Sequence, residues 1–146
     1  MERREFLIGL GAAAAVISVS QGFAQSTSAP GVEQMHAPKY KALAESCSHS
    51  VAAGEDCLRH CFGMLSMNDT SMVGCTKSIY DMVAVCGALQ SLAAVNSPHT
   101  PTLAKAVADI CGACQKQCEK FPNILECKAC AQACESCTDE CRKVAT

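Results

Sequence analysis

Cysteine recurs at every third or fourth residue in the stretch CKACAQACESCTDEC, which runs from Cys127 to Cys141. The same spacing is found in CGACQKQC at 111–118 and in CLRHC at 57–61. Residues three and four apart lie on one face of an α-helix, so each stretch predicts a row of thiols along a helix. The chain has 13 cysteines, namely Cys47, Cys57, Cys61, Cys75, Cys86, Cys111, Cys114, Cys118, Cys127, Cys130, Cys134, Cys137 and Cys141.

Thiolate is a soft ligand that selects Cu(I), zinc or iron–sulfur clusters. A tetrahedral zinc site built from the pairs at 111/114 and 127/130 would leave the other thiols unexplained. Iron–sulfur clusters use cysteines on wrapping loops, and no such Gly- or Pro-rich loop is visible. Cu(I) needs only two or three sulfurs, and one ion per thiolate leaves a buried core neutral. The pattern therefore favours storage of many Cu(I) ions, about one per thiol, with an iron–sulfur or zinc-binding redox or structural protein as the alternative.

Two further interpretations of the thiols stay open. Exported cysteine-rich chains are usually disulfide scaffolds, but an odd number leaves one thiol unpaired. Cβ atoms along a helical row lie about 5–6 Å apart, whereas a disulfide needs about 3.8 Å, so only bonds between helices fit. Cysteine also serves as a small core residue, although a core of cysteine and alanine leaves destabilising voids.

A second group of soft ligands surrounds the predicted turn between the first two helices: His60, Met64, Met67 and Met72. Thioether is an uncharged and weaker copper ligand than thiolate, so it suits the transfer of an ion inward to the cysteines. Methionine at helical spacing is also an ordinary core residue. We expect this group to form the site of metal uptake at one end of the fold.

The elements that position these residues are four helices, predicted from the periodicity of apolar and cysteine residues. Short connections make successive helices antiparallel. The predicted fold is therefore all-α, an antiparallel up-down four-helix bundle with a cysteine-lined core. The first helix is predicted over residues 39–67, and the second starts within 68–71 and ends at about 95. The third is predicted over 100–121 and the fourth from 123 to about 144.

The helix starts are predicted from capping residues. The run from Asn68 to Ser71 supplies caps for the second helix, and Thr100 precedes a proline at the first position of the third helix. Asn123 with Glu126 three residues later forms a capping pair for the fourth helix.

The N-terminal segment MERREFLIGLGAAAAVISVSQGFA pairs two arginines with a short apolar run and ends in small residues. This pattern predicts a twin-arginine signal peptide over 1–24 and export to the periplasm or another extracytoplasmic compartment. The apolar run is too short to span a bilayer, so we expect no membrane span in the mature form. Residues 25–38 predict a flexible arm, which leaves 39–146 as the metal-binding bundle.

The chain carries 12 basic and 14 acidic residues, two Tyr and no Trp. Without a basic stripe, and with only two Tyr and four Phe on which bases could stack, we expect no nucleic-acid partner. No nucleophile elbow, paired-carboxylate motif or nucleotide-binding loop is present, so we expect a binding protein and not an enzyme.

The motifs GEDCLRHCF, SMVGCTKSIYDMVAVCGAL, DICGACQKQCEKFP and ECKACAQACESCTDEC resemble those of the exported copper storage proteins, the Csp family. The resemblance covers nearly all of the region after the arm. It implies a four-helix bundle, tetrameric in the exported members, with Cu(I) held by the core cysteines. It also implies that the histidine and three methionines named above lie at the open end of the bundle. By analogy, a copper-requiring client enzyme or a chaperone is a further expected partner.

One position departs from the family pattern. The first core thiol of the family lies at the position of Ser50, whereas this chain has Cys47, one helical turn earlier. The sulfur is therefore expected on the same helix face but shifted along the axis.

Overall fold

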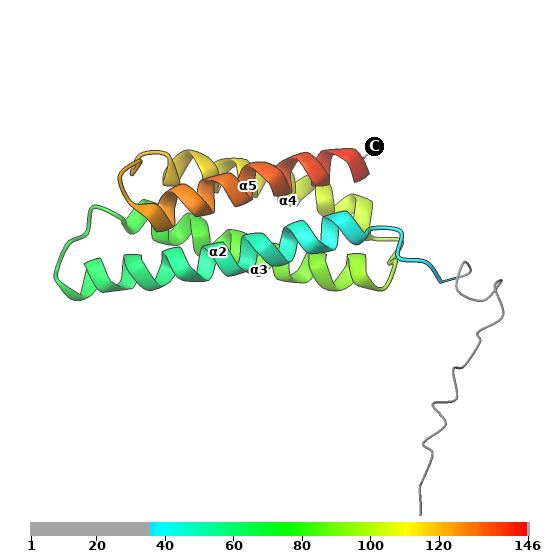
Figure 1. The fold of residues 1–146 in the computed structure, drawn as a ribbon, viewed down its shortest axis with the longest axis horizontal. Helices are drawn as coiled ribbons and strands as arrows, with labels where there is room; N and C mark the ends of the chain where they lie inside the picture. The colour runs from blue at the N-terminus through cyan, green and yellow to red at the C-terminus, as the bar shows by residue number, and fades with distance from the viewer. Residues whose placement is uncertain (1–35, 146) are drawn as a thin grey trace, which may run out of the picture. The chain divides into compact units, whose positions relative to one another are not determined.

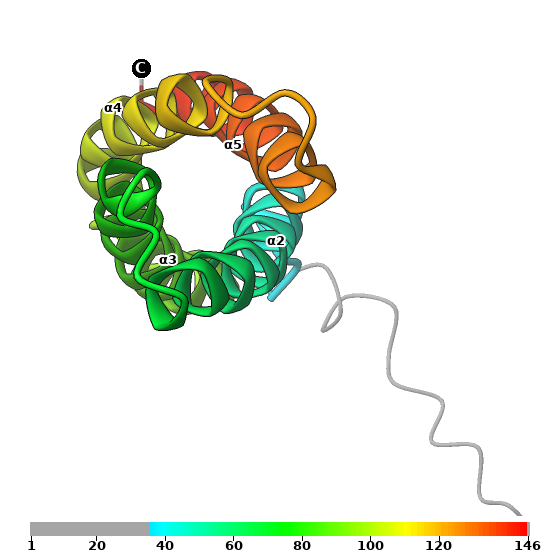
Figure 2. The same cartoon turned by 90° about the vertical axis from the view of Figure 1, so that its left-hand side faces the viewer.

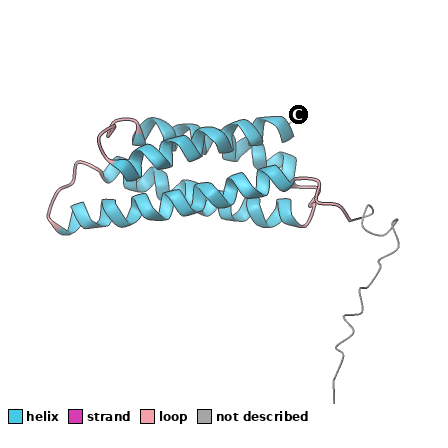
Figure 3. Ribbon diagram, viewed as in Figure 1, coloured by secondary structure: helices cyan, strands magenta, loops and turns pink. Residues whose placement is uncertain are grey.

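The computed structural model describes residues 36–145, all of which belong to one body. The predicted signal peptide and residues 25–35 of the predicted arm lie outside the described residues. Four helices and no strand are found between 36 and 145, as Figures 1 and 3 show, which confirms the predicted all-α fold. The helices are α2 (Lys41–Ser66), α3 (Val73–Ala94), α4 (Thr100–Cys118) and α5 (Leu125–Val144).

The four helices form a ring around one axis (Figure 2). Each helix packs against its neighbours in sequence, and α5 also packs against α2, whereas the backbones of helices on opposite sides of the ring do not approach each other closely. Successive helices run antiparallel (Figure 1). The end that carries the connections α2–α3 and α4–α5 is called the two-loop end below, and the opposite end is called the one-loop end. Side chains from all four helices therefore meet along a single core.

Asparagine residues end both α2 and α3. Asn68 and Asn96 have positive φ values of 62° and 53°. Around Asn68, two backbone N–H groups bond back to the last turn of α2, from Asn68 to the carbonyl of Leu65 and from Asp69 to the carbonyl of Met64, both at 3.0 Å. This is the Schellman arrangement, in which asparagine tolerates the left-handed conformation. Asn68 therefore ends α2 and does not cap α3, contrary to the sequence prediction.

The other predicted caps are also wrong. α3 begins at Val73, and the Asp69 carboxylate accepts a bond from the Ser71 N–H at 2.9 Å within the preceding turn. Thr100 is the first residue of α4 and not its cap. Ile124, in an extended conformation, precedes α5, and no side chain caps that helix. The turns between helices satisfy the local backbone without the predicted side-chain caps.

The core changes character along its length. At the one-loop end it is filled by apolar side chains that are almost fully buried, namely Leu43, Leu89, Ala93, Ala104 and Val107. Thiols occupy the middle and the two-loop end. The core at this end is therefore mainly hydrocarbon, with the buried hydroxyl of Thr100 as a polar exception.

Gly54 brings α2 and α3 close together at mid-height. A Cβ atom at this position would lie 2.6 Å from Cγ2 of Val83 and 2.7 Å from Cε of Met82. A Cβ atom essentially never lies this close to another side chain, so a residue larger than glycine would force Val83 or Met82 to shift. Among the described residues, no helix combines the length and the hydropathy needed to cross a membrane.

Candidate metal centre

All thirteen thiols lie in the core. Each cysteine side chain is at most 1% exposed, and all are free thiols. The predicted inward orientation of the cysteine rows is therefore confirmed. Every helix contributes: Cys47, Cys57 and Cys61 come from α2, Cys75 and Cys86 from α3, Cys111, Cys114 and Cys118 from α4, and the remaining five from α5.

Sulfur atoms from different helices lie within contact distance. Cys57 Sγ lies 3.6 Å from Cys127 Sγ, and the same distance separates Cys75 from Cys118. A disulfide bond is about 2.05 Å long, so these are contacts between separate thiols. With a metal–sulfur bond of about 2.3 Å, two ligands of a trigonal site lie about 4.0 Å apart. The core thus holds its sulfurs at separations that suit a shared ion.

The thiols also gather into groups of three, in each of which all sulfurs lie within 4.8 Å of one another. Every group draws on at least two helices, and two of them draw on three. Three sulfurs match the low coordination number of Cu(I), whereas structural zinc takes four ligands. Among the described residues these groups are Cys47/Cys86/Cys137, Cys57/Cys61/Cys75, Cys57/Cys118/Cys130 and Cys114/Cys130/Cys134.

Burial and neighbouring thiols change the acidity of the cysteines in opposite directions. Burial raises the pKa of Cys61 to about 12. In contrast, hydrogen bonds from Cys111 and then from Cys141 lower the pKa of Cys137. A few sulfurs can therefore carry negative charge while their neighbours stay protonated, and a metal ion must displace those remaining protons.

His60 lies at the two-loop end with its ring largely enclosed. Nδ1 is 3.9 Å from a carboxylate oxygen of Glu126, and Nε2 is buried without a hydrogen-bond partner. Histidine ligands of metals commonly turn one ring nitrogen toward a carboxylate and use the other for the metal. The free Nε2 is thus the atom of His60 that suits a ligand role.

The three methionines predicted beside His60 differ in exposure. Met72 is buried, Met64 is partly buried against the core, and Met67 is 67% exposed. The structure therefore places Met64 and Met72 against the thiol core at the two-loop end, and Met67 in solvent at the end of α2.

Two features of this site do not follow from the spacing of residues in the sequence. Glu126, predicted to help cap a helix, faces His60 because α5 packs beside α2. Ser50 is fully buried in the core and donates a hydrogen bond from its hydroxyl to the carbonyl of Ala133, at 3.1 Å. Cys47 is buried on the same face of α2, as expected, and joins Cys86 and Cys137 in a group of three.

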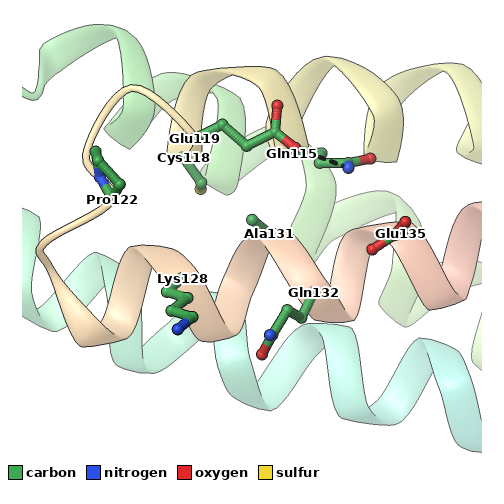
Figure 4. Close-up of a pocket in the computed structure, with 8 residues that line it drawn as sticks. All are labelled: Gln115, Cys118, Glu119, Pro122, Lys128, Ala131, Gln132 and Glu135. Carbon is green, nitrogen blue, oxygen red and sulfur yellow. Dashed lines mark hydrogen bonds between the residues drawn. The ribbon is translucent and has the colours of Figure 1, made fainter.

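A groove of about 330 Å³ between α4 and α5 approaches the core from the side. Figure 4 shows Cys118 reaching from α4 into this groove, opposite Ala131 of α5. Cys118 lines the groove although it is only 1% exposed. The groove is lined by Gln115, Cys118, Glu119, Pro122, Lys128, Ala131, Gln132 and Glu135.

A ring of four helices closed around thirteen buried free thiols defines a helical bundle with a core suited to soft metals. The chain belongs to the copper storage protein family, whose model matches residues 36–146. It is 29% identical over 105 residues to the uncharacterized cysteine-rich protein YhjQ of Bacillus subtilis strain 168, which covers 72% of this chain and 94% of that protein. The apo form of copper storage protein 3 from Bacillus subtilis has a similar fold, with a TM-score of 0.64 and 29% identity over 73% of this chain and 98% of the other.

Proposed function

We propose that this protein stores Cu(I), with about one ion per core thiol. The observation that carries the proposal is the set of 13 buried free thiols arranged in three-membered groups across the helices. Membership of the copper storage protein family supports copper as the metal. The protein acts as a binding protein without catalysis.

The charge of the core favours a high loading. A buried thiolate without a partner costs several kcal/mol or more, and so does a buried cation. One Cu(I) for each thiolate cancels both charges, whereas a few ions bound by many thiolates would leave negative charge along the axis. The store is therefore expected to fill until ions and thiolates are nearly equal in number.

Titration of the reduced protein with Cu(I), in competition with a strong Cu(I) chelator, tests this function. About thirteen ions per chain are expected, and the same protein should bind far less Zn(II) in tight sites. Saturation at one or two ions would contradict storage. Charge-transfer bands of iron in the protein after anaerobic reconstitution would instead support the iron–sulfur alternative.

We propose that ions enter at the two-loop end through His60, Met64, Met67 and Met72. The buried, unpartnered Nε2 of His60 supports this route, and so do the positions of Met64 and Met72 against the thiols. The core at the one-loop end is mainly apolar and has no histidine or methionine among its buried residues, so it is less suited to the uptake of a soft ion. Exposed Met67 is suited to the first contact with an ion, and buried Met72 is suited to the transfer of that ion inward.

We also propose export through the twin-arginine pathway and assembly into a homotetramer. The arginine pair ahead of an apolar run supports export. Exposed Phe62 and Tyr80, which lie on a shared groove of α2 and α3, supply an apolar surface for association. Changing both arginines to lysine should abolish export, which tests the pathway. Sedimentation analysis of the mature protein tests the homotetramer. A client that takes up copper would be sought by transfer from the loaded protein.

A further inference from the structure

The thiols of the core divide into two sets by their contacts. The deep set consists of Cys47, Cys86, Cys111, Cys137 and Cys141, joined by sulfur contacts of 3.6–4.0 Å. The outer set, nearer the two-loop end, consists of Cys57, Cys61, Cys75, Cys114, Cys118, Cys127, Cys130 and Cys134, joined by sulfur contacts of 3.6 Å and by three of the groups of three. None of these hydrogen-bonded sulfur contacts joins one set to the other.

On α2 and α3 a long gap separates the two sets. Cys47 and Cys57 are ten positions apart on α2, a rise of about 15 Å along the helix axis. Cys75 and Cys86 are eleven positions apart on α3, which is a gap of similar length. The positions between are filled by buried residues without thiols, namely Ser50, Gly54, Ile79 and Met82. This half of the core offers no thiolate for an ion in transit.

On α4 and α5 the row of thiols is continuous. Toward the one-loop end, Cys111 lies one helical turn beyond Cys114 on α4, and Cys137 lies one turn beyond Cys134 on α5. The Cβ atoms of each pair are therefore about 5–6 Å apart. The neighbouring thiol of Cys111 is also the largest cause of the raised pKa of Cys134, which indicates that the two thiols lie near each other across α4 and α5. The two sets therefore meet at Cys111 of the deep set and Cys134 of the outer set.

We propose that Cys111 and Cys134 form the bridge over which Cu(I) passes from the outer set to the deep set. This inference rests on the proposed copper storage. Two sulfurs that share one ion in a linear site are about 4.6 Å apart, twice a metal–sulfur bond of about 2.3 Å. Such a span cannot cross the gap of about 15 Å on α2 and α3.

Each transfer is an exchange of ligands. A bond from copper to the sulfur of Cys111 forms as the bond to a sulfur of the outer set breaks, and the proton of the incoming thiol passes to the sulfur that is left. Copper remains Cu(I), so no electron donor or acceptor is needed. Without both bridge thiols, the shortest gap on α5 is from Cys130 to Cys137, about 10 Å along the axis, which is again too long.

The test compares two variants that each lose two thiols. Cys111→Ser with Cys134→Ser removes the bridge, and Cys61→Ser with Cys141→Ser removes one thiol from the far end of each set. The time course of Cu(I) transfer from a coloured chelator to the reduced, full chain is recorded. The control variant also loses two binding thiols, so its capacity should fall to about eleven ions, but it should show no separate slow phase. The bridge variant should fill its seven outer thiols first, and its four deep thiols in a separate phase at least tenfold slower than the filling of the deep set in the control.

Equal rates for the two variants would overturn the proposal, and so would filling of the deep set before the outer set. If circular dichroism shows that the bridge variant is unfolded, the single variants Cys111→Ser and Cys134→Ser are compared with Cys61→Ser, and equal rates again overturn it. Met82→Leu should leave the time course unchanged. A slower filling of the deep set in this variant would instead show that the Met82 thioether carries the ion across the gap. Uptake of only one or two ions by the wild type would instead contradict the storage function itself.

Discussion

At the scale of single residues, position in the core gives chemically identical thiols different properties. Burial raises the pKa of Cys61, whereas donated hydrogen bonds lower the pKa of Cys137. His60 has one ring nitrogen near a carboxylate and the other buried and free. These differences arise from the packing of the helices around one core, and each leads to a measurable effect.

Cys61 should make the metal-free protein less stable in alkaline solution. Its thiol has a reference pKa of 9.0 and a folded pKa of about 12. Below about pH 9 the thiol is protonated in both the folded and the unfolded state, so its contribution to stability is fully present. Between about pH 9 and 12 only the unfolded state loses the proton. The free energy of unfolding therefore falls in this range, by up to about 1.4 kcal/mol per pH unit. Urea unfolding of the reduced protein from about pH 8 to about pH 10.5 should show a flatter pH dependence for Cys61→Ser. Identical slopes for variant and wild type would contradict this assignment.

Glu126 should speed the capture of the first ions by His60. Its carboxylate faces Nδ1, which leaves Nε2 as the ligand atom, and loss of such a partner typically costs about 10–100-fold in metal affinity. Glu126→Gln should therefore slow initial Cu(I) uptake several-fold without changing the final capacity. Glu135→Gln, an exposed carboxylate on the same helix, is the matched control and should have no effect. Equal initial rates for the two variants would show that Glu126 does not position the histidine.

At the scale of the helices, contacts between elements override local preferences. Glycine lowers the stability of a helix interior by about 1 kcal/mol relative to alanine, yet α2 has Gly54 at its centre. The close approach of Val83 and Met82 from α3 explains the glycine. Likewise, Asn68 ends α2 in the left-handed conformation instead of capping α3, and Asn96 ends α3 in the same conformation.

Alanine should therefore have opposite effects at two helical glycines. At Gly54 the new methyl group would overlap Cγ2 of Val83 at 2.6 Å, so Gly54→Ala should lower the free energy of unfolding by about 1–3 kcal/mol. At Gly87, in the middle of α3, nothing lies within 4 Å of the added Cβ, so Gly87→Ala should raise it by up to about 1 kcal/mol. Chemical denaturation of both variants measures this. A stabilised Gly54→Ala would mean that α2 and α3 separate at little cost.

At the scale of the whole molecule, the ring of helices makes the metal sites and the fold depend on each other. Two groups of three thiols take their members from three different helices. An ion bound in such a group links helices that otherwise meet only through side-chain contacts. Ligands that bind only the folded state stabilise it by mass action.

Copper loading should therefore stabilise the bundle progressively. Each site held at about 100 times its dissociation constant adds about 2.7 kcal/mol to the free energy of unfolding. The unfolding temperature of the reduced protein should rise with each added equivalent of Cu(I), and removal of the metal by a strong chelator should reverse the rise. A midpoint that stays constant through the titration would show that the ions bind outside the interhelical groups.

The sequence by itself determined the number of helices, their approximate bounds and the burial of every cysteine. The reason is that a spacing of three and four residues fixes one face of a helix, whatever that helix packs against. It also directed attention to His60, Met64 and Met72 at one end of the bundle, where the structure places them. Their role as ligands stays a prediction.

Only the tertiary structure decided which thiols meet. The partner of Cys57 is Cys127, 70 positions away in the chain, because α5 returns beside α2 and closes the ring. The same closure brings Glu126 to His60, places Ser50 against Ala133, and divides the core into an outer and a deep set. The spacing of residues along one helix sets which face they share. Contacts between helices depend in addition on the position of each helix along the common axis. That position is fixed only when all four helices pack together.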